Sequence, residues 1–262
     1  MNNAENRIPT TITLETDNRN RFWYRHAQRR GWSITKLLIG ANLIFFVWMI
    51  LRGLIAGRGL STVMSPDLDL LVYVGAQNWG RVFAHGEWWR IISYSYTHGG
   101  LLHLAFNMVA LYQVGLLLEK EAGHAALLVV YVFSTLTATL AGYLWHPEAY
   151  VVGASGALFG LIGFAVLFYR RQGDPHSMAK SKFMLQWALF AFLFGLAVQA
   201  DNAGHFGGAV GGALAALVLS PRLLFRPDTH PALKCLAWAC ALFSGAALLM
   251  LVKFWIVLEK GL

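Results

Sequence analysis

Seven apolar runs constrain the fold of this 262-residue chain more than any other feature of its sequence. A hydrocarbon core about 30 Å thick needs a helix of roughly 17 to 25 apolar residues to cross it. With 57% hydrophobic and 13% charged residues, the chain has more apolar surface than a soluble domain of this length buries. We therefore predict an all-α polytopic membrane protein with seven spans. The runs lie at residues 34–56, 98–118, 122–145, 155–170, 183–199, 203–220 and 233–257, and the fourth and sixth are short.

The positive charges predict the orientation, because Lys and Arg stay preferentially on the cytoplasmic side. The polar tail at residues 1–33 contains six arginines and has no apolar core of a cleaved signal peptide. More Lys and Arg follow the fourth and sixth runs, whereas the links at 146–152 and 200–202 contain none. We expect the N-terminus inside and the C-terminus outside. Acidic residues in the tail disfavour an organellar transit peptide, so we expect a bacterial inner membrane.

Three regions are expected along the chain. Residues 1–33 form a cytoplasmic tail, and residues 34–220 form a six-helix core. Its first outer segment, about residues 57–97, interleaves Trp and Tyr with single charges, which predicts short helices partly embedded in the membrane. Residues 221–262 form a link and a seventh helix on the outside of the core. The net charge of +8 follows from this topology, and its distribution among short loops disfavours a nucleic-acid surface.

Five polar side chains fall inside the second, fourth and sixth runs, where ionisable groups are costly and are functional candidates. Ser155 precedes the inner anchor Arg170 by 15 residues, which is about 22 Å of helix and puts it a few ångströms below the outer boundary. Similar spacing places residues of the other two runs at the same level. The five side chains are those of Ser155, His205, His103, Asn107 and His98, and His98 is the first residue of the second run.

This set of side chains restricts the chemistry. Neutral histidine is the base that activates a serine hydroxyl at neutral pH, so Ser155 and His205 are the predicted nucleophile and base. His103 and Asn107 lie four residues apart on one helical face and supply donors for an oxyanion, with the Ser155 backbone N–H as a third. Apart from Asp201 just outside, no carboxylate lies at this depth. We therefore predict a dyad rather than a triad.

Other catalytic sites are not matched by the sequence. It has no H-E-x-x-H motif of a zinc protease, and the spans lack the paired carboxylates of an aspartyl protease. The esterase motif G-x-S-x-G fails because Ala157 occupies its last position. Cys235 and Cys240 lie on different faces of one helix and suggest neither a disulfide nor a metal site. We expect no metal and no organic cofactor.

Together these residues resemble the rhomboid family of intramembrane serine proteases. The resemblance runs from about Glu87 to Leu219. It implies that Ser155 is the nucleophile, His205 the base, and His103 with Asn107 the oxyanion donors. The motifs that carry it are Glu87-Trp88-Trp89-Arg90; His98, His103 and Asn107; Gly115, Glu119 and Gly123; Gly153-Ala154-Ser155-Gly156; and Ala203-Gly204-His205-Phe206-Gly207-Gly208.

The resemblance also implies supporting roles for residues near the serine, Gly153 and Gly156 among them, and for His98. The position four residues after the serine is usually tyrosine in the family and stacks on the catalytic histidine. Here it is Phe159, so we expect stacking without the hydroxyl. Trp187 in the fifth run is a candidate for the gate through which substrate enters. The expected partners are the lipid bilayer and single-span transmembrane protein substrates, which unwind locally before attack.

Several side chains have a structural interpretation. Glycines spaced four apart in the sixth run predict a close crossing with the fourth run, and Glu119 and Arg90 are expected to be structural clamps. Alternatives to a protease remain open. One is a catalytically silent rhomboid-like protein that binds membrane helices without cutting them. Others are a transporter or channel, disfavoured by the apolar inner halves of the runs, and a purely structural protein. The sequence does not indicate the oligomeric state.

Overall fold

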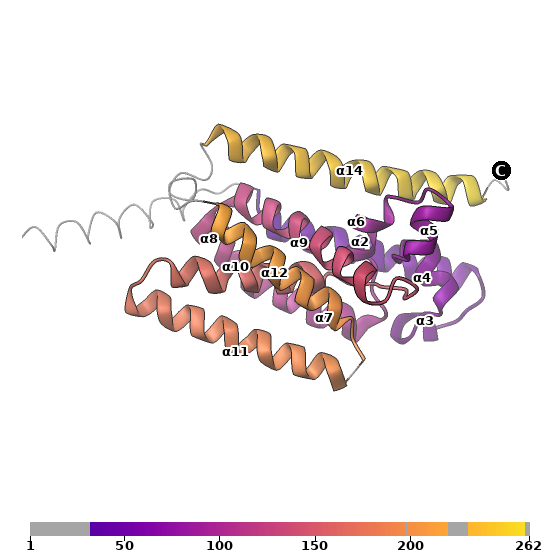
Figure 1. The fold of residues 1–262 in the computed structure, drawn as a ribbon. Coiled ribbons are helices and arrows are strands. Elements are labelled where there is room, and N and C mark those ends of the chain that lie inside the picture. Colours follow the sequence, from indigo (N-terminus) through magenta and orange to yellow (C-terminus); the bar gives the residue numbers. More distant parts are fainter. Residues whose placement is uncertain (1–31, 198, 220–229, 260–262) are drawn as a thin grey trace, which may run out of the picture. The chain divides into compact units, whose positions relative to one another are not determined.

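The helices and their connections follow from a computed structural model, which describes residues 32–197, 199–219 and 230–259 (Figure 1). The predicted cytoplasmic tail and the link after the sixth run therefore lie almost wholly outside the described residues. Within these residues the elements are helices, and the extended pairing is a single isolated bridge between Gln77 and Val151. The architecture is that of an all-α polytopic membrane protein, which confirms the predicted fold class.

All seven apolar runs contain helix. Four of the resulting stretches are long and apolar enough to cross a membrane: α2, the continuous run from Leu101 to Ala122, α9 and α14. The run from Leu101 to Ala122 contains a π-helical turn, η2, between α7 and α8. The bounds are α2 Ile34–Ile55, α7 Leu101–Ala110, η2 Leu111–Gly115, α8 Leu116–Ala122, α9 His124–Trp145, α10 Ser155–Arg170, α11 Pro175–Ala197, α12 Asn202–Val218 and α14 Pro231–Glu259.

The other three helices are α10, α11 and α12, and the fourth and sixth runs form short helices, as the sequence predicted. Helix α10 has 16 residues and α12 has 17, so at 1.5 Å per residue each is about 24 to 26 Å long and shorter than a hydrocarbon core. Helix α11 has 23 residues, and its first turns are polar. Each short helix carries a predicted site residue in its first turn, Ser155 in α10 and His205 in α12.

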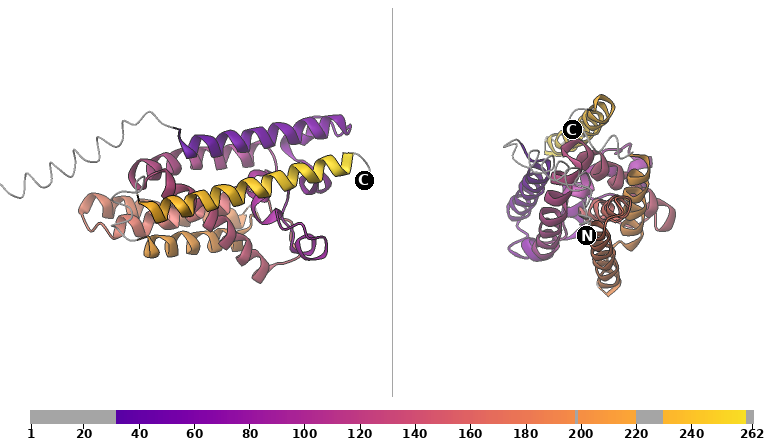
Figure 2. Two further views of the ribbon diagram at one scale, coloured as in Figure 1. Left: turned by 90° about the horizontal axis from the view of Figure 1, so that it is seen from above. Right: turned by 90° about the vertical axis from the view of Figure 1, so that its left-hand side faces the viewer.

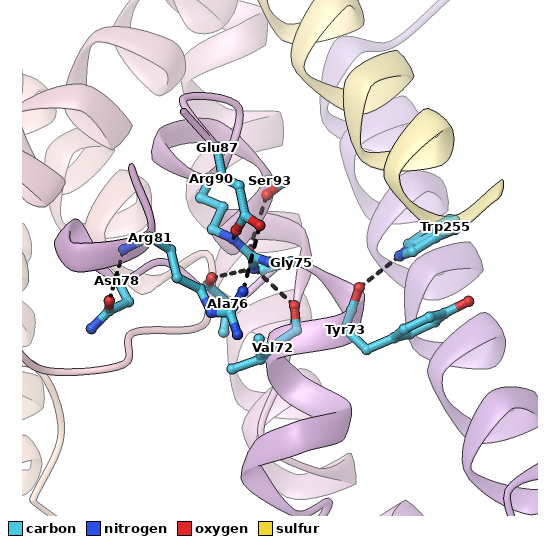
Figure 3. Close-up of polar contacts among 10 residues, drawn as sticks. All are labelled: Val72, Tyr73, Gly75, Ala76, Asn78, Arg81, Glu87, Arg90, Ser93 and Trp255. Atoms are coloured by element: carbon cyan, nitrogen blue, oxygen red, sulfur yellow. Dashed lines mark hydrogen bonds and ion pairs between the residues drawn. The ribbon is translucent and has the colours of Figure 1, made fainter. Parts of the chain in front are cut away.

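The first outer segment folds into short helices, as its sequence predicted. They are α3 Ser61–Met64, α4 Leu68–Val74, α5 Trp79–Ala84, α6 Arg90–Ser93 and the 3-10 helix η1 Tyr94–Tyr96. Arg90 is fully buried among them and donates Nη1 hydrogen bonds to the carbonyls of Val72 and Ala76, at 2.8 and 2.7 Å. Its Nε lies 2.5 Å from Glu87 Oε2. Because one guanidinium joins three turns, Arg90 acts as the predicted clamp (Figure 3).

Helix α10 lies in the middle of the bundle between α9, α11 and α12. It approaches α12 so closely that a Cβ added at Gly208 or Gly212 would run into the carbonyl of Gly156 or Gly160. On its other side, a Cβ at Gly160 would meet Ser134 of α9. The predicted close crossing of the fourth and sixth runs is therefore present, and it is made by backbone against backbone.

One end of each of three helices meets the others at Glu119 of α8. Its carboxylate accepts from Ser33 Oγ at 2.7 Å and from the backbone N–H groups of Ile34 and Thr35 at 2.5 and 3.2 Å. His124 Nδ1 lies 2.5 Å from the same carboxylate. An anion at the N-terminus of α2 satisfies donors that have no partner within that helix. Glu119 thus ties α8 to α2 and to the start of α9.

The seventh helix, α14, packs along α9 and against α6 of the first outer segment (Figure 2). Three of its buried residues recur every four positions, at Ala247, Leu251 and Trp255, and Leu233 and Ser244 are buried as well. Leu242 and Leu249 on other faces are each 71% exposed, as expected for side chains in contact with lipid. The helix therefore covers one side of the core through a single face.

Candidate active site

The hydroxyl of Ser155 and the imidazole of His205 meet at the crossing of α10 and α12. Ser155 is the first residue of α10, and His205 lies in the first turn of α12. His205 Nε2 lies 2.8 Å from Ser155 Oγ, within hydrogen-bond distance. Ser155 is half-buried and His205 is 6% exposed. The glycine contacts between the two helices bring these side chains together, because larger residues would hold the backbones apart.

A third side chain, Asn202, completes a hydrogen-bonded row that the sequence analysis missed. Its Oδ1 lies 3.0 Å from His205 Nδ1, and its Nδ2 donates to the carbonyl of Phe192 at 3.4 Å. When His205 Nε2 accepts the serine hydroxyl proton, the neutral ring carries its own proton on Nδ1 and donates it to Asn202. The sequence signal for this amide is its position three residues before His205 on the same helix, which places the two side chains on one face.

One further contact holds the imidazole in place, and a carboxylate caps the helix that carries it. The ring of Phe159, one turn after Ser155, stacks on His205 with centroids 4.3 Å apart and planes 15° apart. Asp201 caps α12 by accepting from Gly204 N at 2.8 Å, and the same Oδ1 lies 3.0 Å from His146 Nε2. The stacking occurs without a ring hydroxyl, so packing alone fixes that face of His205.

His103 and Asn107 of α7 lie beside Gly153, two residues before Ser155. A Cβ built at Gly153 would be 2.7 Å from His103 Nε2 and 3.6 Å from Asn107 Nδ2. Gly99 N donates to His103 Nδ1 at 3.3 Å, so the proton of the neutral ring is on Nε2, the nitrogen that faces Gly153. Asn107 Nδ2 uses one hydrogen on the His103 carbonyl, at 3.0 Å, and keeps a second. Two donors therefore flank the approach to the serine.

The segment before Ser155 is extended and anchored to the first outer segment. Gln77 and Val151 exchange two backbone hydrogen bonds, each 2.9 Å long. Gly153 N donates to the carbonyl of Tyr94 at 3.0 Å, and Gly153 has a φ of +114°, which favours glycine. The chain can then turn directly into α10 at Ser155. The position of the serine thus depends on Gln77 and Tyr94, which lie 78 and 61 positions earlier in the chain.

The remaining predicted site residues have different surroundings. His98 is buried and packs edge-on against His103, with ring centroids 5.2 Å apart. Gly156 lies in the helix crossing, where its carbonyl faces Gly208. Trp187 is 43% exposed on α11 and packs edge-on against Phe190. With Phe183 and Gln186 these two rings line a hollow on the outer face of that helix. Across the described ranges, no hydrogen bond or ring contact joins Trp187 to the Ser155 and His205 cluster.

The arrangement fits nucleophilic chemistry at a serine. It contains a hydroxyl, a base within hydrogen-bond distance, an amide that orients the base, and two side-chain donors on the opposite side. In the described part of the chain, no group of three His, Cys, Asp or Glu side chains converges as metal ligands would. The residues present can carry out acyl transfer through their own groups.

Comparisons with known proteins identify one family. The family model of the Rhomboid domain matches residues 85–222. Rhomboid protease GluP of Bacillus subtilis (strain 168) is 31% identical over 188 residues, which are 71% of this chain and 35% of that protein. RHOMBOID-like protein 5 of Arabidopsis thaliana is 36% identical over 171 residues, 63% of this chain and 53% of that protein.

A third relative is described as inactive by its name. Inactive RHOMBOID-like protein 8 of Arabidopsis thaliana is 27% identical over 172 residues, 64% of this chain and 49% of that protein. The chain thus spans about half the length of these relatives or less. The matched region begins just after α5 and includes α6, η1 and every helix from α7 to α12.

Proposed function

The chain belongs to the rhomboid family, and from that premise we propose that it is an intramembrane serine endopeptidase. It hydrolyses a peptide bond in or next to a transmembrane helix of its substrates. The observation that carries this proposal is the 2.8 Å contact between Ser155 Oγ and His205 Nε2 at the shared outer ends of α10 and α12. Packing between helices would not require that the Ser155 hydroxyl bond to a histidine, or that Asn202 orient the histidine ring.

In the proposed first step, Ser155 Oγ attacks the carbonyl carbon of the scissile bond while His205 Nε2 takes the hydroxyl proton. Asn202 Oδ1 accepts from the opposite ring nitrogen and stabilises the imidazolium that forms. The negative charge that develops on the substrate oxygen is stabilised by His103 Nε2–H, Asn107 Nδ2–H and the N–H of Ser155. As the first residue of α10, Ser155 has an N–H without an intrahelical partner.

His205 then donates its proton to the departing amine, and an acyl-enzyme ester remains on Ser155. A water molecule gives a proton to His205 and attacks the ester, which releases the acid and restores the hydroxyl. Water reaches the site from the outer side, where Ser155 is half-buried rather than sealed. The lipid-facing helices keep hydrocarbon away from this hydrated region.

The substrates we propose are single-span membrane proteins in the same bilayer. A helix hides its carbonyls in hydrogen bonds, so the scissile segment must unwind before Ser155 can reach it. Helix-breaking and small residues near the cleavage point favour that unwinding. Trp187 on α11 is our candidate for a residue at the entry path.

The proposed location is a bacterial inner membrane, with the N-terminus inside and the site facing the outer side. We propose the same three regions as the sequence predicts. They are a cytoplasmic tail at residues 1–33, a six-helix core at 34–220, and a link with the seventh helix at 221–262.

A second candidate is a protein that binds membrane helices without cutting them. The relative named Inactive RHOMBOID-like protein 8 is the observation that keeps this possibility in view. The two candidates differ in the reactivity of Ser155. An activated serine reacts with a fluorophosphonate, whereas an ordinary buried serine does not.

The test is reconstitution of the purified chain in liposomes with a panel of single-span substrate helices. Cleavage is compared for the wild type, Ser155→Ala and His205→Ala, with Ser244→Ala as a matched control. Ser244 is a buried serine on α14, away from any base in the site. We expect cleavage by the wild type and by Ser244→Ala, and none by the other two. Cleavage by Ser155→Ala at the wild-type rate contradicts the proposal, and labelling without cleavage of any helix favours a different substrate class.

A further inference from the structure

The outer third of α14 touches the first outer segment through a small aromatic cluster. Trp255 Nε1 donates to the carbonyl of Tyr73 at 2.7 Å, and the two rings stack with centroids 6.0 Å apart. On its other side, the indole contacts Trp48 of α2 at 5.3 Å. Trp255 is only 9% exposed. A buried indole N–H requires an acceptor, so this hydrogen bond sets the position of α14 along α4.

The residue before Trp255 contacts the Arg90 clamp. The centroids of the Phe254 and Trp89 rings lie 5.2 Å apart. The guanidinium carbon of Arg90 lies 5.4 Å from the centroid of the Phe254 ring. One turn earlier, Leu251 packs at Gly75, where an added Cβ would lie 3.2 Å from Leu251 Cδ2. Figure 3 shows Trp255 and Arg90 reaching the same short helix, one at Tyr73 and the other at Val72 and Ala76. The C-terminal end of α4 is therefore held from two sides.

The residues that follow α4 pair with the segment that precedes the nucleophile. Ala76, whose carbonyl accepts from Arg90, is followed by Gln77, which pairs with Val151 through two backbone hydrogen bonds. Val151 and Gly153 form the extended segment before Ser155. A continuous series of contacts thus runs from α14 through α4 to the start of α10.

We propose that Trp255 and Phe254 are positioning residues for the reaction. They hold the end of α4, and through Gln77 they fix the extended segment that presents Ser155 to its oxyanion donors. The seventh helix is then part of what keeps the site in its reactive geometry, in addition to covering the core. This inference rests on the proposed function for its kinetic consequence, but its structural consequence, the rigidity of the Gln77 and Val151 pairing, is measurable without any catalysis.

The test uses the full chain in lipid nanodiscs, with Trp255→Ala, Trp255→Phe and Phe254→Leu. The matched control is Trp238→Ala on the same helix, because Trp238 is 69% exposed. Three quantities are measured: hydrogen exchange of the Gln77 and Val151 amides, the rate of fluorophosphonate labelling at Ser155, and kcat separately from KM. Trp255→Phe keeps a stacked ring and removes only the N–H donor, so it separates the hydrogen bond from packing.

For Trp255→Ala we expect exchange at Gln77 and Val151 to be faster by about ten-fold, and labelling and kcat to fall by about as much. KM should stay unchanged, because the substrate path is not altered. Trp255→Phe should give an intermediate effect, and Trp238→Ala should match the wild type. If Trp255→Ala does not fold, Trp255→Phe and Phe254→Leu decide the question.

Two results overturn the inference. One is a folded Trp255→Ala protein with wild-type exchange and labelling. The other is a variant whose folded fraction is labelled at the wild-type rate although its Gln77 and Val151 amides exchange faster or its thermal stability is lower. In that case α14 would stabilise the fold without positioning Ser155. If the wild type itself is not labelled, the proposed function fails, and hydrogen exchange alone still decides whether α14 fixes the Gln77 and Val151 pairing.

Discussion

At the scale of single residues, the orientation of His205 depends on uncharged neighbours. Asn202 accepts from one ring nitrogen, Ser155 lies at the other, and Phe159 covers one face of the ring. A carboxylate in place of Asn202 would bring a charge to membrane depth, where it is costly. An amide provides direction to the imidazole at a smaller desolvation cost.

Replacing Asn202 tests this interpretation. Asn202→Ala removes one acceptor, and the loss of a hydrogen bond to a group that becomes charged should lower kcat by about ten-fold. KM should change little, because Asn202 does not line the substrate path. Asn202→Asp retains an acceptor in the same place and should recover part of the rate. Equal kcat values for Asn202→Ala and the wild type would show that Phe159 and the helix backbone are sufficient.

Gly153 combines a positive φ with a tight contact, and the two effects can be separated. Gly153→Ala should lower stability by about 1 to 3 kcal/mol through strain and should abolish most labelling of Ser155, because its Cβ displaces His103. Gly173→Ala is the control, since Gly173 has a φ of +77° and nothing within 4 Å of an added Cβ. It should show the strain in thermal unfolding but keep wild-type labelling. Similar labelling in both variants would argue against an oxyanion role for His103.

At the scale of helices, the crossing of α10 and α12 determines whether the dyad can form. Gly208→Ala puts a methyl group against the carbonyl of Gly156, next to Ser155, and should cost about 1 to 3 kcal/mol of stability. Gly212→Ala makes the equivalent contact one turn deeper, at Gly160.

We expect the two variants to be destabilised alike, while labelling falls more in Gly208→Ala because its clash is nearer the dyad. Gly245→Ala on α14, where an added Cβ meets nothing within 4 Å, should be neutral or gain up to roughly 1 kcal/mol. Thermal unfolding and labelling rate measured on the same samples distinguish these outcomes. A larger loss of labelling in Gly212→Ala would mean that helix tilt, rather than local separation, controls the dyad.

At the scale of the whole molecule, a structural clamp at one end is separated from the site at the other. Glu119 joins α8, α2 and α9 through four polar contacts. Glu119→Ala leaves several donors without an acceptor and should lower the free energy of unfolding by about 2 to 4 kcal/mol. The folded fraction should still label at the wild-type rate. Glu148→Ala, an exposed carboxylate, serves as the control and should leave unfolding unchanged.

Much of the helical architecture was predictable from sequence, because apolar run length and charge placement are direct consequences of a bilayer solvent. The shared depth of Ser155 and His205 followed from the same arithmetic. The short helices of the first outer segment were also predicted, but their packing was not, since Arg90 bonds to carbonyl groups that only the tertiary structure brings together. The sequence also did not show which face of α14 packs against the core, because lipid and protein both accept apolar side chains. The role of Asn202 was not predicted, because the partner expected for a catalytic histidine is a carboxylate.

The contact between α10 and α12 has a consequence for how the protein responds to its surroundings. The distance between Ser155 and His205 is set by glycine against carbonyl oxygen, with few flexible side chains between them. Changes in lipid chain length or fluidity act on exposed surfaces such as α11 and the outer segment. They should therefore change how often a substrate arrives, while the intrinsic reactivity of the serine, measured with a small probe, stays nearly constant from one bilayer to another.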